Sequence, residues 1–363
     1  MDRSSTPTEG APIAEQDAAV RDVLRRFPID PAEVRMESVP HALGFSGAVI
    51  RRVSVERREA APILPDRIPA VFCLRGWPPK SLPHQRIIEL HRFQHFLDAA
   101  GLHVIPVPIA SVRGETLMLR DGRFWQLEPW MPGVAGFRCS ATDARLQSAM
   151  KVLASLHLAA ARFEPTAAGR PWFAGLLTAP SPAVRERLAL MQDWTDQRLN
   201  HAHKCIGHAG DSQFAPLAGE IINHFRSLRQ QGIEELLGMS RVAVPLQVCL
   251  RDVWHDHLLF TDDELTGLVD LSAARTENVA ADLSRLLGSL FGKWSDRWDT
   301  ALEIYGRMRP LSAQERQLVR VLHRSGTLLS GMAWIERQIN GDIAPEMLPR
   351  AVKRLEWIRG QWD

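Results

Sequence analysis

Two segments in the second half of this chain carry residues that could do chemistry. "CLRDVWHDHLLF" (249–260) sets two acids and two histidines between apolar flanks, and Asp270 follows a later apolar run, "GLV". If the apolar flanks pair as strands, Asp252 and Asp270 are held together at one end of a sheet. One carboxylate can then orient a hydroxyl group while the other holds a divalent cation. On spacing alone, a solvated hairpin whose acids cap turns explains the pattern equally well.

A metal-dependent hydrolase is one alternative. In a loop, His255, Asp256 and His257 could converge on a single ion, and "HAHKCIGH" (201–208) adds further nitrogen and sulfur donors. Such donors suit zinc, but their spacing does not match that of known zinc sites. An exposed polar loop or helix end accounts for the second cluster without any metal.

Composition limits the class of protein. The chain has 363 residues, 45% hydrophobic and 24% charged, with a formal net charge of +2. These are values of a soluble globular protein with room for two lobes, and they predict no affinity for nucleic acid or membranes. The N-terminus lacks the apolar core of a secretory signal, and the four cysteines show no CxxC spacing. We therefore expect a cytoplasmic protein with reduced thiols.

The elements that must position these residues fall into two groups. The first half predicts strands at 48–56 and 68–75, where apolar residues alternate, and at 116–120 and 123–128, which flank an Asp-Gly turn. An amphipathic helix is expected between these pairs, from about Pro83 to Ala100.

The second half reads as helical. One helix begins near Ser140, and another begins at Ser312, where Glu315 completes a capping box. Further helices are expected at about 182–200, 215–237, 280–292, 298–308 and 346–360, with one hairpin at 258–270. The fold class is therefore α+β and bilobal: a flexible tail (1–14), a small strand-rich lobe (15–131) and a larger helical lobe (132–363).

Together these features resemble the aminoglycoside phosphotransferase and choline kinase-like family, which has a protein-kinase-like fold. The catalytic pattern of that family is His-Gly-Asp-(x)4-Asn, then a hairpin, then an apolar strand ending in Asp. Here "LRDVWHDHLLF" and "LTGLVDLSAAR" take these places, and "NVAADLSRLLGSL" (278–290) follows them. "SLH" (155–157) and "EPWMPG" (128–133) extend the resemblance, which covers about residues 40 to 335.

The resemblance assigns roles to individual residues. Asp252 matches the catalytic base, Asp270 the magnesium-binding acid, and Asp282 the acid that braces the catalytic loop. Arg75 falls where the family has a strand-borne Lys or Arg that contacts nucleotide phosphates, and Glu89 would pair with it. The implied cofactors are ATP or GTP as phosphoryl donor and Mg²⁺ or Mn²⁺.

Two further segments would contact the nucleotide. "HALGFSGAV" matches the glycine-containing loop over the phosphates, which places Gly44, Ser46 and Gly47 in the site. Glycine there lets the backbone approach closely. "LEPWMPG" matches the hinge, where backbone groups of Glu128 and Trp130 would meet the purine.

The chain departs from the family pattern at two places. His257 stands where the family has Asn, and magnesium prefers oxygen ligands, so Asp256 or a water would take over, the second metal would be missing, or manganese would be preferred. Leu250 and Arg251 replace His-Gly. Arg251 could neutralise phosphate charge during catalysis, or pair with Asp256 or Asp282.

The expected function is an ATP- or GTP-dependent phosphotransferase that acts on a hydroxyl group of a small molecule, aminoglycoside-like or amino-alcohol-like. A catalytically silent, kinase-like binding protein is the alternative, because the family's Asn and His-Gly are absent. Retention of both Asp252 and Asp270 argues against that alternative. The sequence does not indicate the oligomeric state.

Overall fold

The computed structural model describes residues 20–39, 47–55, 71–208 and 213–362. The chain divides into two compact units. The N-terminal unit comprises Met1–Pro132, Thr166–Gly169 and Gly267–Val269, and the C-terminal unit comprises Gly133–Pro165, Arg170–Thr266 and Asp270–Asp363. The division thus falls next to the expected boundary at 131/132, and two short later segments join the first unit. The expected tail, 1–14, lies outside the described residues.

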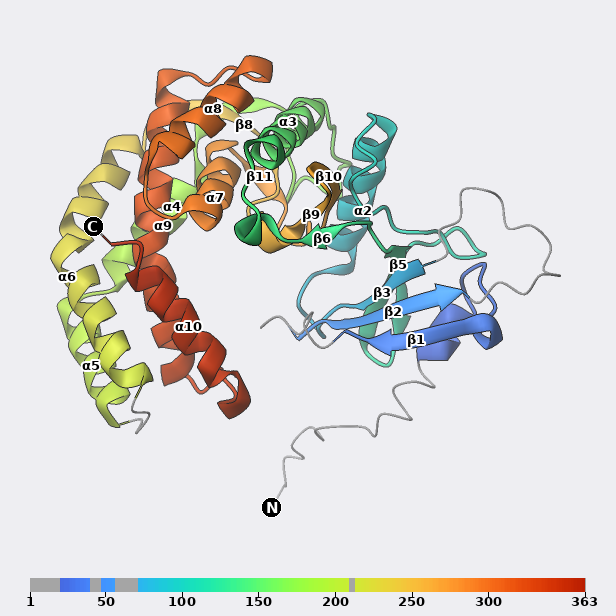
Figure 1. Ribbon diagram of the computed structural model, residues 1–363, viewed down its shortest axis with the longest axis horizontal. Coiled ribbons are helices and arrows are strands. Elements are labelled where there is room, and N and C mark those ends of the chain that lie inside the picture. The colour runs from blue at the N-terminus through green and yellow to red at the C-terminus, as the bar shows by residue number, and fades with distance from the viewer. Residues whose placement is uncertain (1–19, 40–46, 56–70, 209–212, 363) are drawn as a thin grey trace. The chain divides into compact units, whose positions relative to one another are not determined.

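A five-stranded antiparallel sheet forms the frame of the N-terminal unit (Figure 1). Its order is β1-β2-β3-β5-β4, made of Val34–Ser38, Val49–Val55, Val71–Gly76, Arg123–Pro129 and Met118–Arg120. The Asp-Gly turn between β4 and β5 is present, with positive φ angles of 51° at Asp121 and 70° at Gly122. The predicted helix is α2 (His84–Ala99), and the expected strands and helix of this unit are confirmed within the described residues. Residue 56 and residues 68–70 of the expected strands lie outside them.

Alternation along β3 separates a buried face from the face that carries Arg75. Phe72 and Leu74 are fully buried. They pack in one core cluster with Val53 of β2 and with Val20 and Leu24 from the N-terminal helical turn. Because successive strand residues point to opposite faces, Arg75 projects away from this core.

Helices dominate the C-terminal unit. They are α3 (Asp143–Ala160), α4 (Pro182–Asp193), α5 (Asp196–His208), α6 (Phe214–Met239), α7 (Ala280–Phe291), α8 (Asp296–Met308), α9 (Ala313–Ile339) and α10 (Leu348–Arg359). The long helix α9 packs on α6 and α7, and α10 packs on α6 and α9 (Figure 1). Among the described residues, none of the helices has the length and apolar character needed to span a bilayer.

Helix ends agree with the sequence in part. The capping box of Ser312 and Glu315 is confirmed at the start of α9. The expected cap at Ser140 is wrong, because Thr142 accepts the backbone N–H of Arg145 and begins α3 two residues later. The helix expected over 182–200 is broken into α4 and α5.

Two small sheets hold the loops of this unit. One has the order β11-β8-β7, from Arg275–Glu277, Ala243–Cys249 and Leu177–Pro180. The other has the order β10-β9-β6, from Glu264–Leu268, Leu258–Thr261 and Val134–Ala135. The expected hairpin at 258–270 is thus confirmed as β9 and β10, whereas β7 and β11 were not predicted. A strand-rich unit followed by a helical one is the α+β class that the sequence predicts.

Candidate active site

The expected ion pair between Arg75 and Glu89 is not made. The carboxylate of Glu89 is buried on α2 and accepts hydrogen bonds from Arg92 (2.5 Å) and from the backbone N–H and the hydroxyl of Thr166 (2.9 and 2.7 Å). The Arg75 guanidinium lies 4.6 Å from the centroid of the Trp77 ring. In the described part of the chain, neighbouring Arg and Thr side chains therefore satisfy Glu89, which sequence spacing could not reveal. The phosphate-binding role of Arg75 stays a prediction.

The glycine loop and the hinge are described in part. Gly44 and Ser46 lie outside the described residues. Gly47 has a φ of +66° and open space where a Cβ would stand, so its backbone can be approached closely. In the hinge, the backbone N–H of Trp130 donates to the carbonyl of Val71 (3.0 Å), which leaves that N–H unavailable to a purine.

Glu128 belongs to a buried polar chain. Its carboxylate accepts from the amide of Gln126 (2.7 Å), whose carbonyl oxygen faces Trp77 Nε1 (2.7 Å) and His91 Nε2 (2.9 Å). Burial lowers the pKa of His91 to about 4, so the ring is neutral and donates through Nε2. Nδ1 then accepts from the Thr116 hydroxyl (2.8 Å). The side chain of Glu128 thus braces the hinge strand; its contact with a purine stays a prediction.

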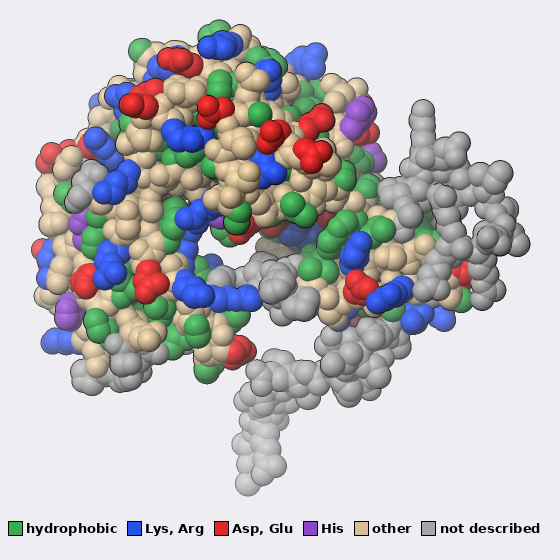
Figure 2. Space-filling view, in the orientation of Figure 1, with side chains coloured by type: hydrophobic (Ala, Val, Ile, Leu, Met, Phe, Trp, Pro, Cys, Tyr) green, Lys and Arg blue, Asp and Glu red, His purple; other side chains and the backbone are tan. Residues whose placement is uncertain are grey.

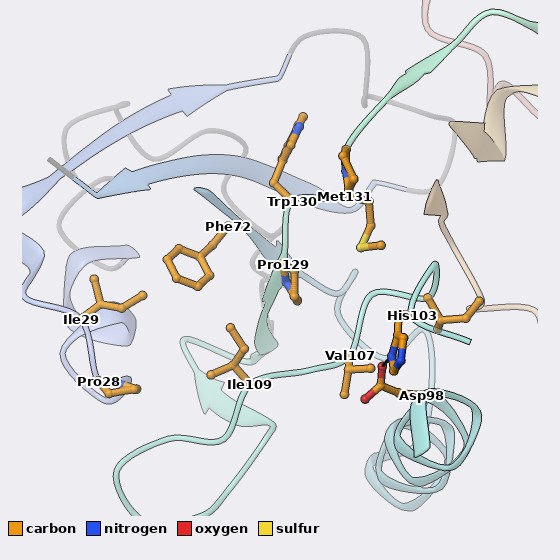
Figure 3. A pocket seen from close by; sticks show the side chains of 12 residues that line it. Pro28, Ile29, Phe72, Asp98, His103, Val107, Ile109, Pro129, Trp130 and Met131 are labelled. Carbon is orange, nitrogen blue, oxygen red and sulfur yellow. Dashed lines mark hydrogen bonds and ion pairs between the residues drawn. The ribbon is translucent and has the colours of Figure 1, made fainter. Parts of the chain in front are cut away.

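A pocket of about 540 Å³ opens in the N-terminal unit beside the hinge (Figure 3). Its lining is largely apolar and includes Phe72, Ile109 and Trp130. The ion pair between His103 and Asp98 (2.8 Å) lies at its rim, with the His103 ring largely exposed. We find no group here with the reach or burial of a catalytic side chain.

The catalytic loop of the C-terminal unit, residues 250–257, connects β8 to β9 and ends in a single turn of 3₁₀ helix. It is held from α7 by Asp282, which is fully buried. The carboxylate accepts the backbone N–H groups of Leu250 (2.7 Å) and Arg251 (2.6 Å). Two charge-assisted bonds to consecutive backbone groups fix the path of the loop, as the resemblance implies.

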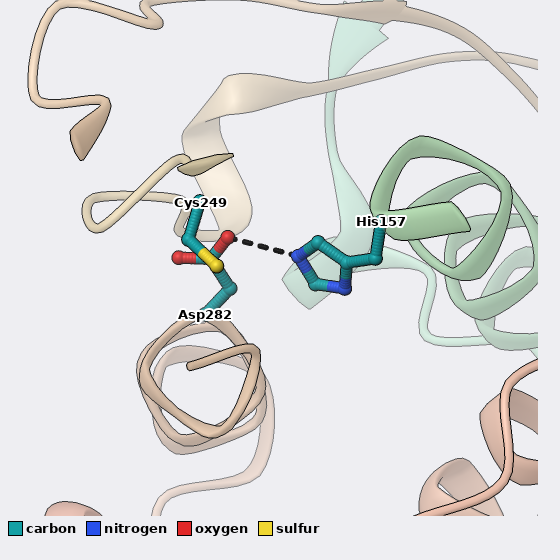
Figure 4. Close-up of side chains that lie close together, drawn as sticks. All are labelled: His157, Cys249 and Asp282. Atoms are coloured by element: carbon teal, nitrogen blue, oxygen red, sulfur yellow. Dashed lines mark hydrogen bonds and ion pairs between the residues drawn. The ribbon is translucent and has the colours of Figure 1, made fainter. Parts of the chain in front are cut away.

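Asp282 also belongs to a buried trio with His157 and Cys249 (Figure 4). His157 Nε2 donates to Asp282 (3.0 Å), and its Nδ1 accepts from the Tyr305 hydroxyl (2.8 Å). Burial lowers the pKa of His157 and raises that of Cys249, whose thiol donates to the carbonyl of Glu277. Both ring nitrogens and the thiol proton are therefore used internally, so the trio braces the fold and does not present a metal site.

Arg251 adopts a left-handed backbone conformation, with a φ of +67°. Its guanidinium donates to Glu186 of α4 (2.5 Å) and lies 3.6 Å from Glu277. The expected pairing with Asp256 is wrong, and Asp282 contacts only the backbone of Arg251. The structure gives Arg251 a positioning role, and its neutralisation of phosphate charge stays a prediction.

Asp252 presents its carboxylate at the surface of the loop. The side chain is 52% exposed, and its Oδ1 accepts from Arg285 Nε at 2.8 Å. The guanidinium of Arg285 lies 5.8 Å from the centroid of the Trp254 ring. Sequence reasoning missed Arg285, although it stands three residues after Asp282 and hence on the same face of α7.

His257 is engaged by the indole of Trp254. Trp254 Nε1 donates to His257 Nε2 (2.7 Å), so the ring proton stands on Nδ1. Burial lowers the pKa of His257, while the charges of Asp270 and Asp252 act in the opposite direction. The charges of both acids thus act on one imidazole. Because Nε2 is already an acceptor, this arrangement does not present His257 as a metal ligand.

Asp270 stands two residues after the end of β10, with a φ of +61°. Left-handed backbone is rare for a residue with a side chain and recurs at functional sites. Its Oδ1 receives a long contact from the backbone N–H of Ser272 (3.4 Å). Asp256 is 52% exposed and lies 3.4 Å from His255 Nε2. Both carboxylates can offer oxygen to a hard cation, and their metal-binding roles stay predictions.

The histidine cluster on α5 carries no metal arrangement in the described residues. His201 Nε2 lies 3.4 Å from Cys205 Sγ, one helical turn away. The only trio of His, Cys, Asp or Glu close enough for a shared ion, among the residues that the structure describes, is the buried trio of His157, Cys249 and Asp282. The hydrolase interpretation therefore has no geometric support in the described residues.

Comparison with known proteins gives one family. The model of the phosphotransferase enzyme family matches residues 66–318. A homoserine kinase from Afipia carboxidovorans is 26% identical over 268 residues, which cover 72% of this chain and 71% of that protein.

Solved structures share the fold. A microcompartment-associated aminopropanol kinase superposes with a TM-score of 0.62 at 14% identity, covering 94% of each chain. The complex of spectinomycin phosphotransferase with ADP and spectinomycin gives 0.61 at 10% identity, covering 93% of each chain. The GDP complex of aminoglycoside 2′-phosphotransferase-IIIa gives 0.58 at 16%, covering 96% of this chain and 98% of that one. With the family match over residues 66–318, this chain belongs to the phosphotransferase enzyme family and is a small-molecule kinase with a hydroxyl acceptor, as its sequence predicts.

Proposed function

We propose that this protein transfers the γ-phosphoryl group of ATP or GTP to a hydroxyl group of a small amino alcohol or related acceptor. The observation that carries the proposal is the placement of two acids around one catalytic loop. Asp252 is exposed beside Arg285, Asp270 is held in a left-handed conformation, and both act on the same imidazole. Phosphoryl transfer depends mainly on positioning and charge neutralisation, which this arrangement can supply.

Asp252 would orient the acceptor hydroxyl and receive its proton. Arg285 bonds to Oδ1, so the second carboxylate oxygen remains for the acceptor. Because a loose transition state needs little proton abstraction at its start, Asp252 need not be a strong base.

Asp270 would hold the magnesium ion that accompanies the nucleotide. Magnesium prefers oxygen ligands in octahedral geometry, and a carboxylate meets that requirement whereas the engaged imidazole of His257 does not. The ion would neutralise charge on the β- and γ-phosphates. Asp256 or a water would then replace the oxygen that the family's Asn supplies. Related structures contain ADP, AMP-PNP with Ca²⁺, and GDP, which supports a nucleoside donor and a divalent metal.

The names of similar proteins favour an amino alcohol as acceptor. They include a homoserine kinase, an aminopropanol kinase and phosphotransferases of aminoglycosides. All three acceptor types carry a hydroxyl group near an amine.

The test is calorimetric titration of ATP and GTP into metal-free protein, with and without Mg²⁺ and Mn²⁺, followed by assays of transfer to homoserine and aminopropanol. Asp252→Asn keeps an oxygen for Arg285 but removes the charged base. It should abolish transfer and leave nucleotide affinity within about twofold. Asp270→Asn should weaken metal-nucleotide binding itself.

The outcomes separate the alternatives. Full turnover by the Asp252→Asn variant would remove Asp252 from its role. Metal-dependent nucleotide binding without transfer to any alcohol would favour a silent binding protein. Absence of nucleotide binding under every condition would refute the proposal.

A further inference from the structure

Three arginines of the C-terminal unit lie on or near the catalytic loop. Arg354 of α10 lies 4.3 Å from the centroid of the Trp357 ring, and Arg138 lies 5.7 Å from the same centroid. Arg138 belongs to a 3₁₀ turn, η3 (Phe137–Cys139), which packs against the turn that ends the loop, η4 (His255–His257). Arg285 bonds directly to Asp252. Arg285 thus contacts the proposed catalytic base, while Arg138 and Arg354 share one indole, and Arg138 stands on a turn that packs against the loop.

Their charges act on one another and on the acids of the loop. Burial lowers the pKa of Arg354 to about 10, and the charges of Arg285 and Arg138 act in the same direction, while Asp252 and Asp256 oppose them. The same three arginines help to lower the pKa of His255, for which burial is the main cause. Three cations thus act on the two carboxylates, Asp252 and Asp256. Figure 2 shows basic side chains gathered along α10 on the visible face.

These guanidinium groups retain donors that the described residues do not use. Arg138 and Arg354 make no hydrogen bond or ion pair within the described part of the chain, and Arg285 uses only Nε. Other arginines of this unit behave differently: Arg198, Arg297, Arg309, Arg324 and Arg359 each pair with a carboxylate. Arg285 and Arg354 are partly buried and Arg138 is exposed, so their unused donors can receive an external anion beside the proposed catalytic carboxylate.

We propose that Arg138, Arg285 and Arg354 form an anion subsite for the acceptor, so that the substrate is a small alcohol bearing a carboxylate, such as a hydroxy acid or hydroxy amino acid. The proposal rests on the proposed function and specifies its acceptor. The planar guanidinium fork matches a carboxylate with two parallel hydrogen bonds, which a lysine cannot reproduce. Arg285 belongs to the subsite and also bonds to the base, so it would contact the carboxylate of the substrate next to its reacting hydroxyl group. A polycationic amino sugar would meet three like charges here.

The experiment measures binding and turnover separately. The probes are 4-hydroxybutyrate, its neutral amide 4-hydroxybutyramide, and glycerol 3-phosphate, each titrated calorimetrically into the full-length protein with Mg²⁺ and AMP-PNP. We expect the carboxylate to bind at least about tenfold more tightly than the amide, since a hydrogen bond between charged groups is lost.

Variants test the residues. Arg354→Gln and Arg138→Gln should each weaken binding of 4-hydroxybutyrate by about 10- to 100-fold and leave affinity for AMP-PNP unchanged. Lys353→Gln removes the same charge from an exposed position of α10 and should change neither. In steady state, the two arginine variants should raise KM for the acid far more than they lower kcat. Melting temperatures close to wild type will show that the variants are folded; Arg138 is exposed, so its variant should fold even if the Arg354 variant does not.

Several results would overturn the subsite. They are equal affinity for acid and amide, failure of both anionic probes to bind, an equal loss in the Lys353→Gln variant, or a loss of AMP-PNP affinity in the arginine variants. Tighter binding of glycerol 3-phosphate than of the acid would overturn the carboxylate and identify a phosphate-bearing alcohol. Transfer to amide and acid with equal kcat/KM refutes the subsite and leaves the kinase intact. Anion binding without transfer to any alcohol refutes the kinase and leaves the subsite.

Discussion

Arg251 offers the sharpest test of how the catalytic loop is built, because two of its properties can be separated by substitution. Its backbone is left-handed (φ +67°), and its side chain bonds to Glu186 at 2.5 Å. Arg251→Gly and Arg251→Ala both remove the guanidinium. Only glycine also removes the steric penalty of the left-handed backbone.

The magnitudes follow from the local contacts. Side chains of Arg251 and Glu186 are 19% and 41% exposed, so breaking their pair costs about 1–2 kcal/mol, less than the 3–5 kcal/mol of a fully buried pair. Glu277 is not orphaned, because Ser181 and the backbone N–H of Ala183 still donate to it. Glycine recovers about 1–2 kcal/mol of strain but adds about 0.4–1 kcal/mol of unfolded-state entropy. Arg251→Gly should therefore be about 0.5–1 kcal/mol more stable than Arg251→Ala.

Urea unfolding of both variants measures this difference as a shift of midpoint at constant slope. The matched control is Lys353→Gly against Lys353→Ala within α10, where alanine should be the more stable by about 1 kcal/mol. If Arg251→Ala proves as stable as Arg251→Gly, the left-handed conformation does not strain this loop and the reasoning fails.

Three further predictions concern charge and pH. His257→Asn should tighten Mg²⁺-dependent ATP binding and raise turnover, because an amide oxygen replaces an imidazole whose Nε2 is engaged by Trp254; weaker binding in calorimetry would mean that the imidazole is used. Although burial alone would raise it, the hydrogen bond and charge of Arg251 hold the pKa of Glu186 below its ordinary value of 4.5. Glu186→Gln should thus lower the free energy of unfolding by up to about 1 kcal/mol at pH 7. Below the lowered pKa of Glu186 the substitution should have no effect. A difference in unfolding free energy that does not change with pH would contradict the ion pair. Burial lowers the pKa of His91 and His323 from 6.5 to about 4, so the unfolded chain binds more protons in that window and stability should fall as pH drops from about 6.5 to 4; a flat profile from unfolding curves would contradict this.

The sequence predicted the scaffold of the site better than its side-chain contacts. The hairpin before Asp270 follows from apolar alternation, and Asp282 was expected to brace the loop, which its bonds to two backbone N–H groups bear out. Hydrophobic periodicity and turn residues act locally, so they can be recognised in a single sequence. The break between α4 and α5 was missed because both halves carry helical periodicity.

The hydrogen-bond partners of the site's side chains could not be predicted, because they depend on packing between segments that are distant in the sequence. Glu89 was assigned to Arg75, but Thr166, 77 positions away in the sequence, supplies two of its hydrogen bonds. The role of Arg285 follows from the structure, in which one face of α7 lies against the loop and both Asp282 and Arg285 bond to it. A helical wheel of 280–291 would have placed both residues on one face, but not against Asp252.

The two residues that depart from the family pattern both have side-chain partners in the C-terminal unit, which bears on whether the protein is active. Where the family has glycine, Arg251 keeps a left-handed backbone and is tied to Glu186. Where the family has asparagine, His257 is tied to Trp254. A left-handed residue with a side chain costs about 1–3 kcal/mol, and both Arg251 and Asp270 adopt that conformation next to or at a proposed catalytic acid. A fold that had lost phosphoryl transfer would gain stability by relaxing either strain, so their joint persistence around Asp252 and Asp270 favours a working catalytic loop with altered supports.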